Sequence, residues 1–339
     1  MIRAASLRLA AAAAALTTLA AGVVATSAAE AATDRPNTLA GARSTASIAN
    51  NAWVREKIGT STDQDWYRYD VPRAGQVMAV LGNLPANYSL AIYDSAGRLV
   101  RSSNHGGVGF ERVIWTAPAK GTYFARVDSA GASSYRTYGL RIRTLPNGLS
   151  VVSQYAFRMT NGHVSIMAEV RNTTSGWRRI SSVFVDLLDK DGRTLATDLT
   201  SLSNITLPPG GVSQINSASV VPAPAGFAKV RIRPASVTVP AADANPKVTA
   251  HRTSSGKDPS GLPTYQGYVS TTSPTTVTDV GIYVAYYDTW GNIRLSSHYG
   301  PRNGTVPAGG TSPFDITMHW APFYPPPNLV TFTAFVSRL

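Results

Sequence analysis

The chain has 339 residues and no cysteine, which excludes disulfide bonds, thiol catalysis and lipid attachment through an N-terminal cysteine. Lysine and arginine number 31 against 19 aspartate and glutamate residues, and the formal net charge of +12 favours anionic partners such as wall teichoic acid, acidic polysaccharide or anionic lipid. The basic residues are scattered, a pattern that also serves solubility, and they form no nucleic-acid-reading motif, so nucleic acid is not an expected partner. Thr, Ser, Val and Gly are abundant and Glu is scarce, which favours an all-β fold.

Residues 1-32 have the pattern of an export signal. Arg3 and Arg8 form a basic start, an alanine-rich apolar run covers Leu9–Val24, and Ala-x-Ala-like cleavage sites follow at Ala29–Ala32. The run is short and mostly alanine, and no later run reaches the ~18 to 20 apolar residues that a spanning helix needs. We therefore expect a secreted protein, extracellular or associated with the cell wall, without a transmembrane segment after signal removal.

A first antiparallel β-sandwich is expected over residues 33-145. A polar leader extends to Trp53, and after it turn signals separate short alternating segments, as in sandwiches and barrels. Trp66 and Trp115 lie on such segments and are expected in the core. The Pro/Gly break at Leu145–Gly148 ends the domain. The expected strands are 65–71, 76–82, 88–94, 112–117, 122–128 and 138–144.

The same stretch resembles the bacterial pre-peptidase C-terminal (PPC) domain. The resemblance rests on "GTSTDQDWYRYDVPRAGQVMAVLG" (59–82), "YSLAIYDSAGRLV" (88–100), "ERVIWTAPAKGTYFARV" (111–127) and "YGLRI" (138–142), which keep that family's order and spacing. It implies a jelly-roll-like sandwich with an accessory role in secretion, processing or attachment to a polymer or surface. The layout differs from that family's, because here the domain comes first and no peptidase precedes it.

Two further sandwiches are expected over 149-240 and 246-339, joined by a Pro/Ala-rich linker. A shift of 99 residues aligns their turns and strand ends without a gap, which indicates a tandem repeat. The aligned segments are "TLPPGG" (206–211) with "TVPAGG" (305–310), and "VFVDLLDKDG" (183–192) with "IYVAYYDTWG" (282–291). The predicted fold is therefore all-β, with three antiparallel β-sandwich domains in tandem, of which the last two are Ig-like repeats.

The repeats resemble the small sandwich of the FxLYD type. The words "VDLLD" (185–189) and "VAYYD" (284–288) stand where that family has Leu-Tyr-Asp, and "AEVRNTT" (168–174) and "QGYVSTT" (266–272) stand where it has Gly-x-Val-x-Asn. The later copy has Thr271 in place of the Asn. The resemblance implies no defined activity.

The skeleton Asp-x-x-Gly occurs in all three expected domains, beginning at Asp94, Asp189 and Asp288. An aspartate at the start of a turn bonds its own backbone, and glycine supplies the positive φ that such a hairpin needs. The pattern therefore predicts hairpin turns and gives these aspartates no catalytic role. Its third copy differs by carrying Trp290.

Asp63 and Asp65 form the best local pair of carboxylates. Residues two apart on a strand share a face, so both oxygens can serve one hard cation. Some relatives of the PPC domain bind calcium, and on that resemblance Asp63, Asp65 and Asp94 are candidate calcium ligands. The alternative is a solvated strand entry whose acids cap a turn.

Aromatic residues in expected loops are the candidate binding groups: Trp177, Trp290, Trp320 and Tyr324. Aromatic faces at loop tips suit stacking on sugar rings or insertion into a peptide or lipid surface. The alternative is that each ring folds back onto its own core.

The sequence favours a secreted, non-catalytic accessory or adhesion protein that binds cell wall, polysaccharide or another exported protein. No zinc motif, nucleophile elbow or phosphate-binding loop is present, and the five histidines are scattered. The alternatives are a peptidase-associated hydrolase with a site between modules, and a partner of a co-secreted protease.

Overall fold

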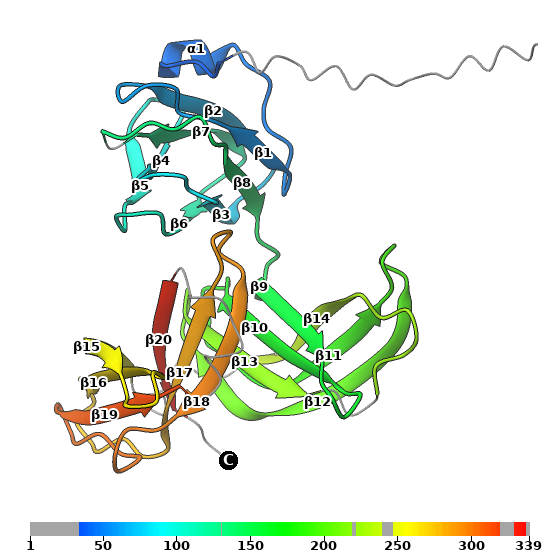
Figure 1. The fold of residues 1–339 in the computed structure, drawn as a ribbon, viewed down its shortest axis with the longest axis vertical. Coiled ribbons are helices and arrows are strands. Elements are labelled where there is room, and N and C mark those ends of the chain that lie inside the picture. The colour runs from blue at the N-terminus through cyan, green and yellow to red at the C-terminus, as the bar shows by residue number, and fades with distance from the viewer. Residues whose placement is uncertain (1–33, 130, 219–221, 239–246, 319–328, 337–339) are drawn as a thin grey trace, which may run out of the picture. The chain divides into compact units, whose positions relative to one another are not determined.

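The computed structural model describes residues 34–129, 131–218, 222–238, 247–318 and 329–336. The predicted export signal, Trp320 and Tyr324 lie outside these residues. Strands pair antiparallel in six sheets (Figure 1), which confirms the prediction of an all-β fold of antiparallel sandwiches. The contacts described below all lie within the compact unit that begins at Arg35. In the described part of the chain, no helix has the length and apolar character to cross a membrane.

The first sandwich packs sheet β1-β8-β3-β6 against sheet β2-β7-β4-β5. Trp115 and Tyr67 are among the buried residues between the two sheets, and Trp66 is buried beside Phe124. The polar leader holds a short helix that the sequence analysis did not anticipate, since the Thr38 side chain accepts the N–H of Gly41 and caps it. The elements are α1 Leu39–Arg43, β1 Trp53–Glu56, β2 Gln64–Val71, β3 Gly75–Gly82, β4 Ser89–Tyr93, β5 Leu99–Ser103, β6 Glu111–Ala117, β7 Gly121–Asp128 and β8 Tyr138–Thr144.

The second and third sandwiches share one strand order. Sheets β13-β10-β9 and β12-β11-β14 make the second, and sheets β19-β16-β15 and β18-β17-β20 make the third. Three strands of the second, β9, β10 and β13, begin and end 99 residues before their counterparts β15, β16 and β19. The strands are β9 Leu149–Arg158, β10 Val164–Asn172, β11 Arg178–Leu188, β12 Thr194–Leu207, β13 Val212–Ala218, β14 Lys229–Thr238, β15 Val248–Lys257, β16 Pro263–Thr271, β17 Val280–Tyr287, β18 Ile293–Tyr299, β19 Thr311–Thr317 and β20 Leu329–Val336.

The central strands β11 and β17 differ in how their outward faces are covered. All eight positions of β17 are buried, whereas β11 leaves Phe184 exposed. Tyr283 and Phe335 of the third sandwich belong to the core cluster of the second, and Met78 and Val80 of the first belong to that of the third. A strand covered on both faces has an apolar run in place of an alternation. The sheet of β17 is therefore an interior layer, and the sheet of β11 faces solvent.

Candidate functional site

The Asp-x-x-Gly segments form hairpin turns, as predicted. In each turn one oxygen of the aspartate accepts the backbone N–H groups two and four residues later, and the glycine has a positive φ between 73° and 88°. Asp258 and Gly261 form a fourth turn of this kind that the sequence analysis missed, although the word "DPSG" carries the signal. The three predicted turns are Asp94–Gly97, Asp189–Gly192 and Asp288–Gly291.

Trp290 lies at the contact between the third and the first sandwich. Its ring centroid is 4.8 Å from that of Trp53, with the rings edge to face, and the Arg55 guanidinium lies 5.6 Å from the Trp290 ring. Gly139 leaves room for the ring, because a Cβ there would lie 2.5 Å from it. The backbone N–H of Asn83 donates to the carbonyl of Thr289 at 2.7 Å. The structure thus gives Trp290 a packing partner within the chain, and a ligand-binding role for it stays a prediction.

Trp177 lines a hollow of about 320 Å³ between the second and third sandwiches. Its lining also includes Lys247, which directly precedes β15, and Thr206, Thr249 and Phe332. Trp177 is partly exposed and Lys247 is exposed. An aromatic face beside an ammonium group and hydroxyls matches a ring-shaped ligand that carries negative charge.

A second hollow of about 680 Å³ lies between the same two sandwiches and is larger and richer in hydroxyls. Met167 and Leu295 give it apolar walls, Ser165 and Ser297 give it hydroxyls, and the Asn216 amide that lines it donates to the carbonyl of Ser296. Neither hollow is lined by a described His, Asp or Glu. The described lining of both hollows therefore offers shape and hydrogen bonds for binding.

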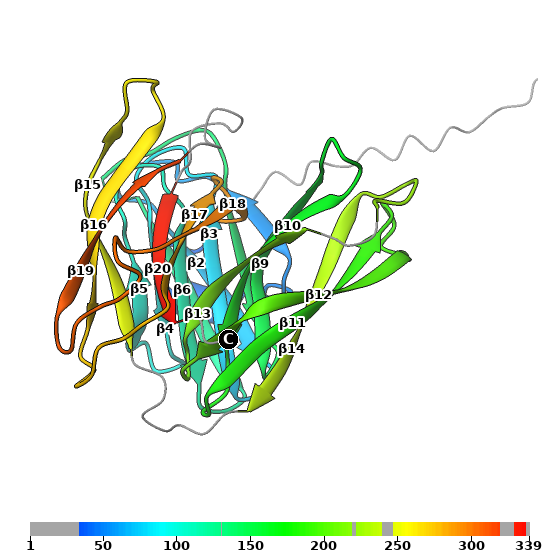
Figure 2. The ribbon, with the colours of Figure 1, turned by 90° about the horizontal axis from the view of Figure 1, so that it is seen from below.

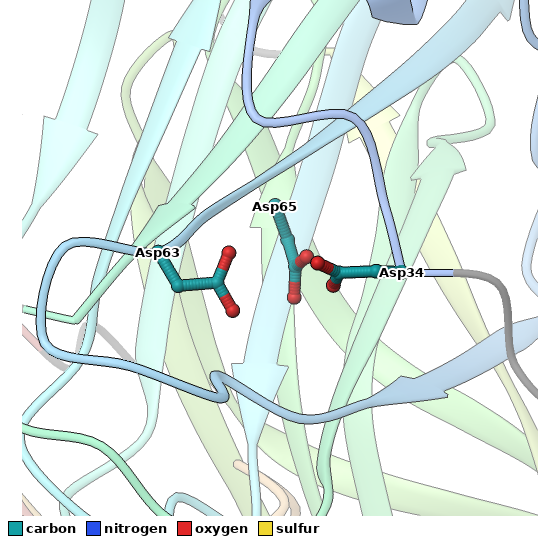
Figure 3. A group of neighbouring side chains, drawn as sticks. All are labelled: Asp34, Asp63 and Asp65. Carbon is teal, nitrogen blue, oxygen red and sulfur yellow. The ribbon is translucent and has the colours of Figure 1, made fainter.

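Asp63 and Asp65 are both buried in the first sandwich. Figure 3 shows the two side chains as neighbours. Each offers a carboxylate oxygen within 4.8 Å of the other's. The Oδ2 of Asp63 accepts the N–H of Gly59 at 2.8 Å, and its Oδ1 has no hydrogen-bond partner within the described part of the chain. Tyr138 donates its hydroxyl to Asp65, and burial together with Tyr67 and Asp65 holds the pKa of Tyr138 well above its usual value. Two close, buried carboxylates fit a hard cation such as Ca²⁺, which is coordinated by several oxygen ligands.

Asp94, the third candidate calcium ligand, lies in the β4–β5 turn and is not among the residues grouped with Asp63 and Asp65. Its carboxylate is held by the N–H groups of the turn and by Arg98, whose Nε donates at 2.8 Å. These hydrogen bonds, those from the backbone of Arg98 first, lower the pKa of Asp94. The calcium role of all three residues stays a prediction.

Ser103, His105 and Glu111 form a polar cluster that sequence reasoning missed. The Nδ1 of His105 lies 2.7 Å from Oε2 of Glu111, and the same oxygen accepts Ser103 Oγ at 2.5 Å. Ser103 Oγ is 3.3 Å from that same Nδ1, so the serine and the acid meet one ring nitrogen. A hydrolase triad needs the nucleophile and the acid on opposite ring nitrogens. The cluster therefore anchors the loop after β5 to the buried Glu111.

A second cluster joins all three sandwiches. The Arg112 guanidinium of β6 lies 2.9 Å from Glu169 of β10, and Tyr287 of β17 donates its hydroxyl to the same carboxylate oxygen. Burial and the neighbouring Glu169 raise the pKa of Tyr287, so the phenol remains a donor. No local sequence signal marks these residues, because the partners come from distant strands.

No protein-family model and no curated protein matches the chain. Among solved structures it is similar to the pre-peptidase C-terminal domain of a collagenase from Bacillus anthracis, with 16% identity over 28% of this chain and 91% of that one, and a TM-score of 0.23. It is also similar to a GH2 β-galacturonidase from Eisenbergiella tayi, with 16% identity, 56% of this chain and a TM-score of 0.33. A β-glucuronidase from Bacteroides uniformis has 13% identity over 72% of this chain, with a TM-score of 0.28.

The chain spans 36% of the galacturonidase and 26% of the glucuronidase. TM-scores of this size carry nothing about activity. The resemblances to the PPC domain and to the FxLYD type both stay predictions. What the chain is, at the level that its structure establishes, is an assembly of β-sandwich modules.

Proposed function

We propose that this protein is a secreted, non-catalytic binding protein that attaches to acidic polysaccharide at a cell wall or another extracellular surface. The observation that carries the proposal is the hollow of about 320 Å³ that the partly exposed Trp177 and the exposed Lys247 both line. A sugar ring presents C–H groups to an aromatic face, and its carboxylate or sulfate group pairs with a cation. The formal net charge of +12 adds long-range attraction to such polymers.

Affinity electrophoresis and calorimetry against a polyuronate, a sulfated glycan and a neutral glucan test the proposal. Binding should be confined to the acidic polymers. It should weaken as NaCl is raised above about 0.15 M, where the Debye length is ~8 Å and charge attraction is screened. Trp177→Ala should weaken binding about tenfold, equal to ~1.4 kcal/mol. Tyr135→Ala removes an exposed aromatic from the first sandwich and serves as the matched control. Wild-type protein that binds none of the acidic polymers at low salt would refute the proposal.

A peptidase-associated hydrolase with a site between modules is the alternative function. The described lining of the two hollows and the geometry of Ser103, His105 and Glu111 give it less support. Turnover of a peptide or glycan library that Glu111→Gln abolishes would establish it. A protein partner, such as a co-secreted protease, is tested by co-purification from culture medium.

Asp63 and Asp65 are proposed as calcium ligands. Their close, buried carboxylates and the Oδ1 of Asp63 support this role. Millimolar Ca²⁺ should raise the Tm of the wild-type protein and leave that of Asp63→Asn unchanged, because binding to the folded state stabilises it. The variant Asp94→Asn tests the third candidate. If the Asp94 carboxylate serves only the hydrogen bonds of its turn, the Tm of this variant should still rise with Ca²⁺. An equal Tm response in wild type and Asp63→Asn would rule the site out.

A further inference from the structure

The outward side of sheet β12-β11-β14 carries cations beside apolar side chains, and we call it the basic face. It consists of Phe184 and Asp186 on β11, Leu199 on β12, and Lys229, Arg231 and Arg233 on β14. The register places Phe184 between Leu199 and Arg233, and Asp186 next to Arg231. Figure 2 shows the three strands side by side. Since alternate residues of a strand share a face, the three cations lie in a row at spacings of about 6.7 Å.

The two arginines are held in place by Asp186. Arg233 donates from Nε and Nη2 to the two oxygens of Asp186, at 3.0 and 2.9 Å, and Arg231 donates from Nε at 2.8 Å. The Asp186 side chain is 2% exposed, while those of Arg231 and Arg233 are 54% and 52% exposed. The Arg233 guanidinium also lies 5.1 Å from the ring centroid of Phe184. A carboxylate beneath two guanidiniums fixes their planes. Arg231 also donates from Nη2 to Thr194 at 3.3 Å, and both arginine side chains stay about half exposed.

The corresponding face of the third sandwich is an interface. There Tyr283 and Ala285 take the places of Phe184 and Asp186, 99 residues on, and Tyr283 packs in the core cluster of the second sandwich. On β20 the residues paired with them are Thr333 and Thr331, and Thr333 accepts the side-chain amide of Gln214 from β13.

In the third sandwich this side of the fold is covered by the second sandwich of the same chain. In the other copy it is open and has cations in place of uncharged residues. Arg233 and Arg231 of β14 stand where β20 has Thr333 and Thr331. The positive charge of the two arginines suits an anionic partner.

We propose that the basic face binds a polyuronate chain, with carboxylates on Arg231 and Arg233 and a sugar ring on the patch of Phe184 and Leu199. This assignment rests on the proposed function and names a second contact surface for it. A uronate carries a ring and a carboxylate on one residue, which matches the apolar pair of Phe184 and Leu199 beside a row of cations on β14. A glycerol phosphate polymer has charge without rings. A second copy of this chain would bring another net positive surface, since the chain has a formal net charge of +12.

The test uses the full chain and polygalacturonate in calorimetry. The variant Asp186→Asn/Arg231→Gln/Arg233→Gln removes the charges together, so no carboxylate is left buried and unpaired. Phe184→Ala removes the ring and leaves the ion pairs. Arg101→Gln, an exposed arginine of the first sandwich, lowers the net charge by one, as the triple variant does, and is the matched control. Circular dichroism and thermal unfolding check the fold of each.

We expect about tenfold weaker binding for the triple variant, roughly threefold weaker binding for Phe184→Ala, and no change for Arg101→Gln. If the variants fold and bind polygalacturonate as tightly as wild type, the proposal for the basic face is refuted. The proposed function is then still tested separately by Trp177→Ala. Where the triple variant fails to fold, Phe184→Ala decides alone. If wild type ignores polygalacturonate but binds the sulfated glycan, the proposed function stands and the polyuronate assignment fails.

Two other occupants are distinguished in the same series. Loss of binding by the triple variant to poly(glycerol phosphate) or to phosphatidylglycerol vesicles, with polygalacturonate unbound, would replace the polyuronate with a phosphate ligand. A dimer in analytical ultracentrifugation that the triple variant abolishes would assign the face to a second copy. Either outcome overturns the proposal.

Discussion

The second and third sandwiches are built on one framework and are used differently. Both have the same strand order, and the turn after the central strand has the same Asp-x-x-Gly geometry. In the second, Asp191 of that turn is exposed and pairs with Lys190, whereas in the third the equivalent Trp290 packs on Trp53 of the first sandwich. Turn residues and alternation thus specify the framework. The outward positions specify which faces are covered.

Glu169 and Tyr268 occupy equivalent outward positions on β10 and β16. Changes to their contacts are expected to give the largest difference in the free energy of unfolding. Glu169 is buried against Arg112, while Tyr268 is exposed and stacks on His251 at 4.7 Å. Arg112→Ala leaves a buried carboxylate without its cation and should cost about 3 to 5 kcal/mol in urea unfolding. Tyr268→Ala should cost under ~1 kcal/mol, since a surface contact is lost. Equal costs would mean that the first sandwich does not cover β10 in solution.

Trp290 and Asp191 give the next contrast. Trp290→Ala removes a partly buried ring from the contact with Trp53 and Gly139 and should cost about 2 to 3 kcal/mol, below the range for a fully buried tryptophan. Asp191→Ala removes an exposed ion pair and should change stability by less than ~0.5 kcal/mol. Urea unfolding measures both, and limited proteolysis should show the Trp290→Ala chain cut faster between sandwiches. A silent Trp290→Ala would return the ring to the role of a free binding group.

These two contrasts also show what the sequence could predict. The turn at Asp288–Gly291 was predictable because its hydrogen bonds lie within the turn. The strands of the first sandwich were predictable close to their observed bounds, whereas β17 is buried at all eight positions and shows no alternation. The packing of Trp290 was not predictable, because its partners Trp53 and Gly139 belong to another domain. The local sequence around a loop tryptophan is the same whether the ring packs on another domain or faces solvent.

The candidate sites divide in the same way. Asp63 and Asp65 were predicted together because residues two apart on an extended segment share a face, and in the structure Asp63 directly precedes β2, which carries Asp65. Asp94 looked similar in sequence, but its oxygens are used locally by the turn. Trp177 and Lys247 line one hollow, and Arg112 pairs with Glu169, only because distant strands pack together. A single sequence gives no information about that packing.

Asp186 gives a contrast in pH dependence. Its hydrogen bonds from Arg233, then those from Arg231 and Thr197, lower its pKa to about 2, whereas the equivalent residue of the third sandwich is Ala285. A folded-state pKa below the unfolded value of ~3.9 stabilises the fold above that value, and the stabilisation is lost as the pH falls toward 2.

The variant that tests this is Asp186→Ala. Because both arginines are half exposed and screened, it should cost about 1 to 2 kcal/mol at pH 7. The difference from wild type should narrow between pH 4 and the folded-state pKa of about 2 in urea unfolding at each pH. A cost that stays constant over that range would assign the effect to packing in place of charge.

Gly192 and Gly291 give the smallest contrast and the sharpest control, because they share a turn and differ in surroundings. Their φ angles are 88° and 73°, so alanine at either site is strained by about 1 kcal/mol. A Cβ at Gly192 meets no atom within 4 Å, whereas a Cβ at Gly291 would lie 2.9 Å from the ring of Phe110, a buried residue of the first sandwich. Gly291→Ala should therefore cost about 1 kcal/mol more than Gly192→Ala in urea unfolding. The backbone strain cancels in that difference. A value near zero would mean that the turn of the third sandwich does not contact Phe110 in solution, so that the turns of both sandwiches are free of such a contact.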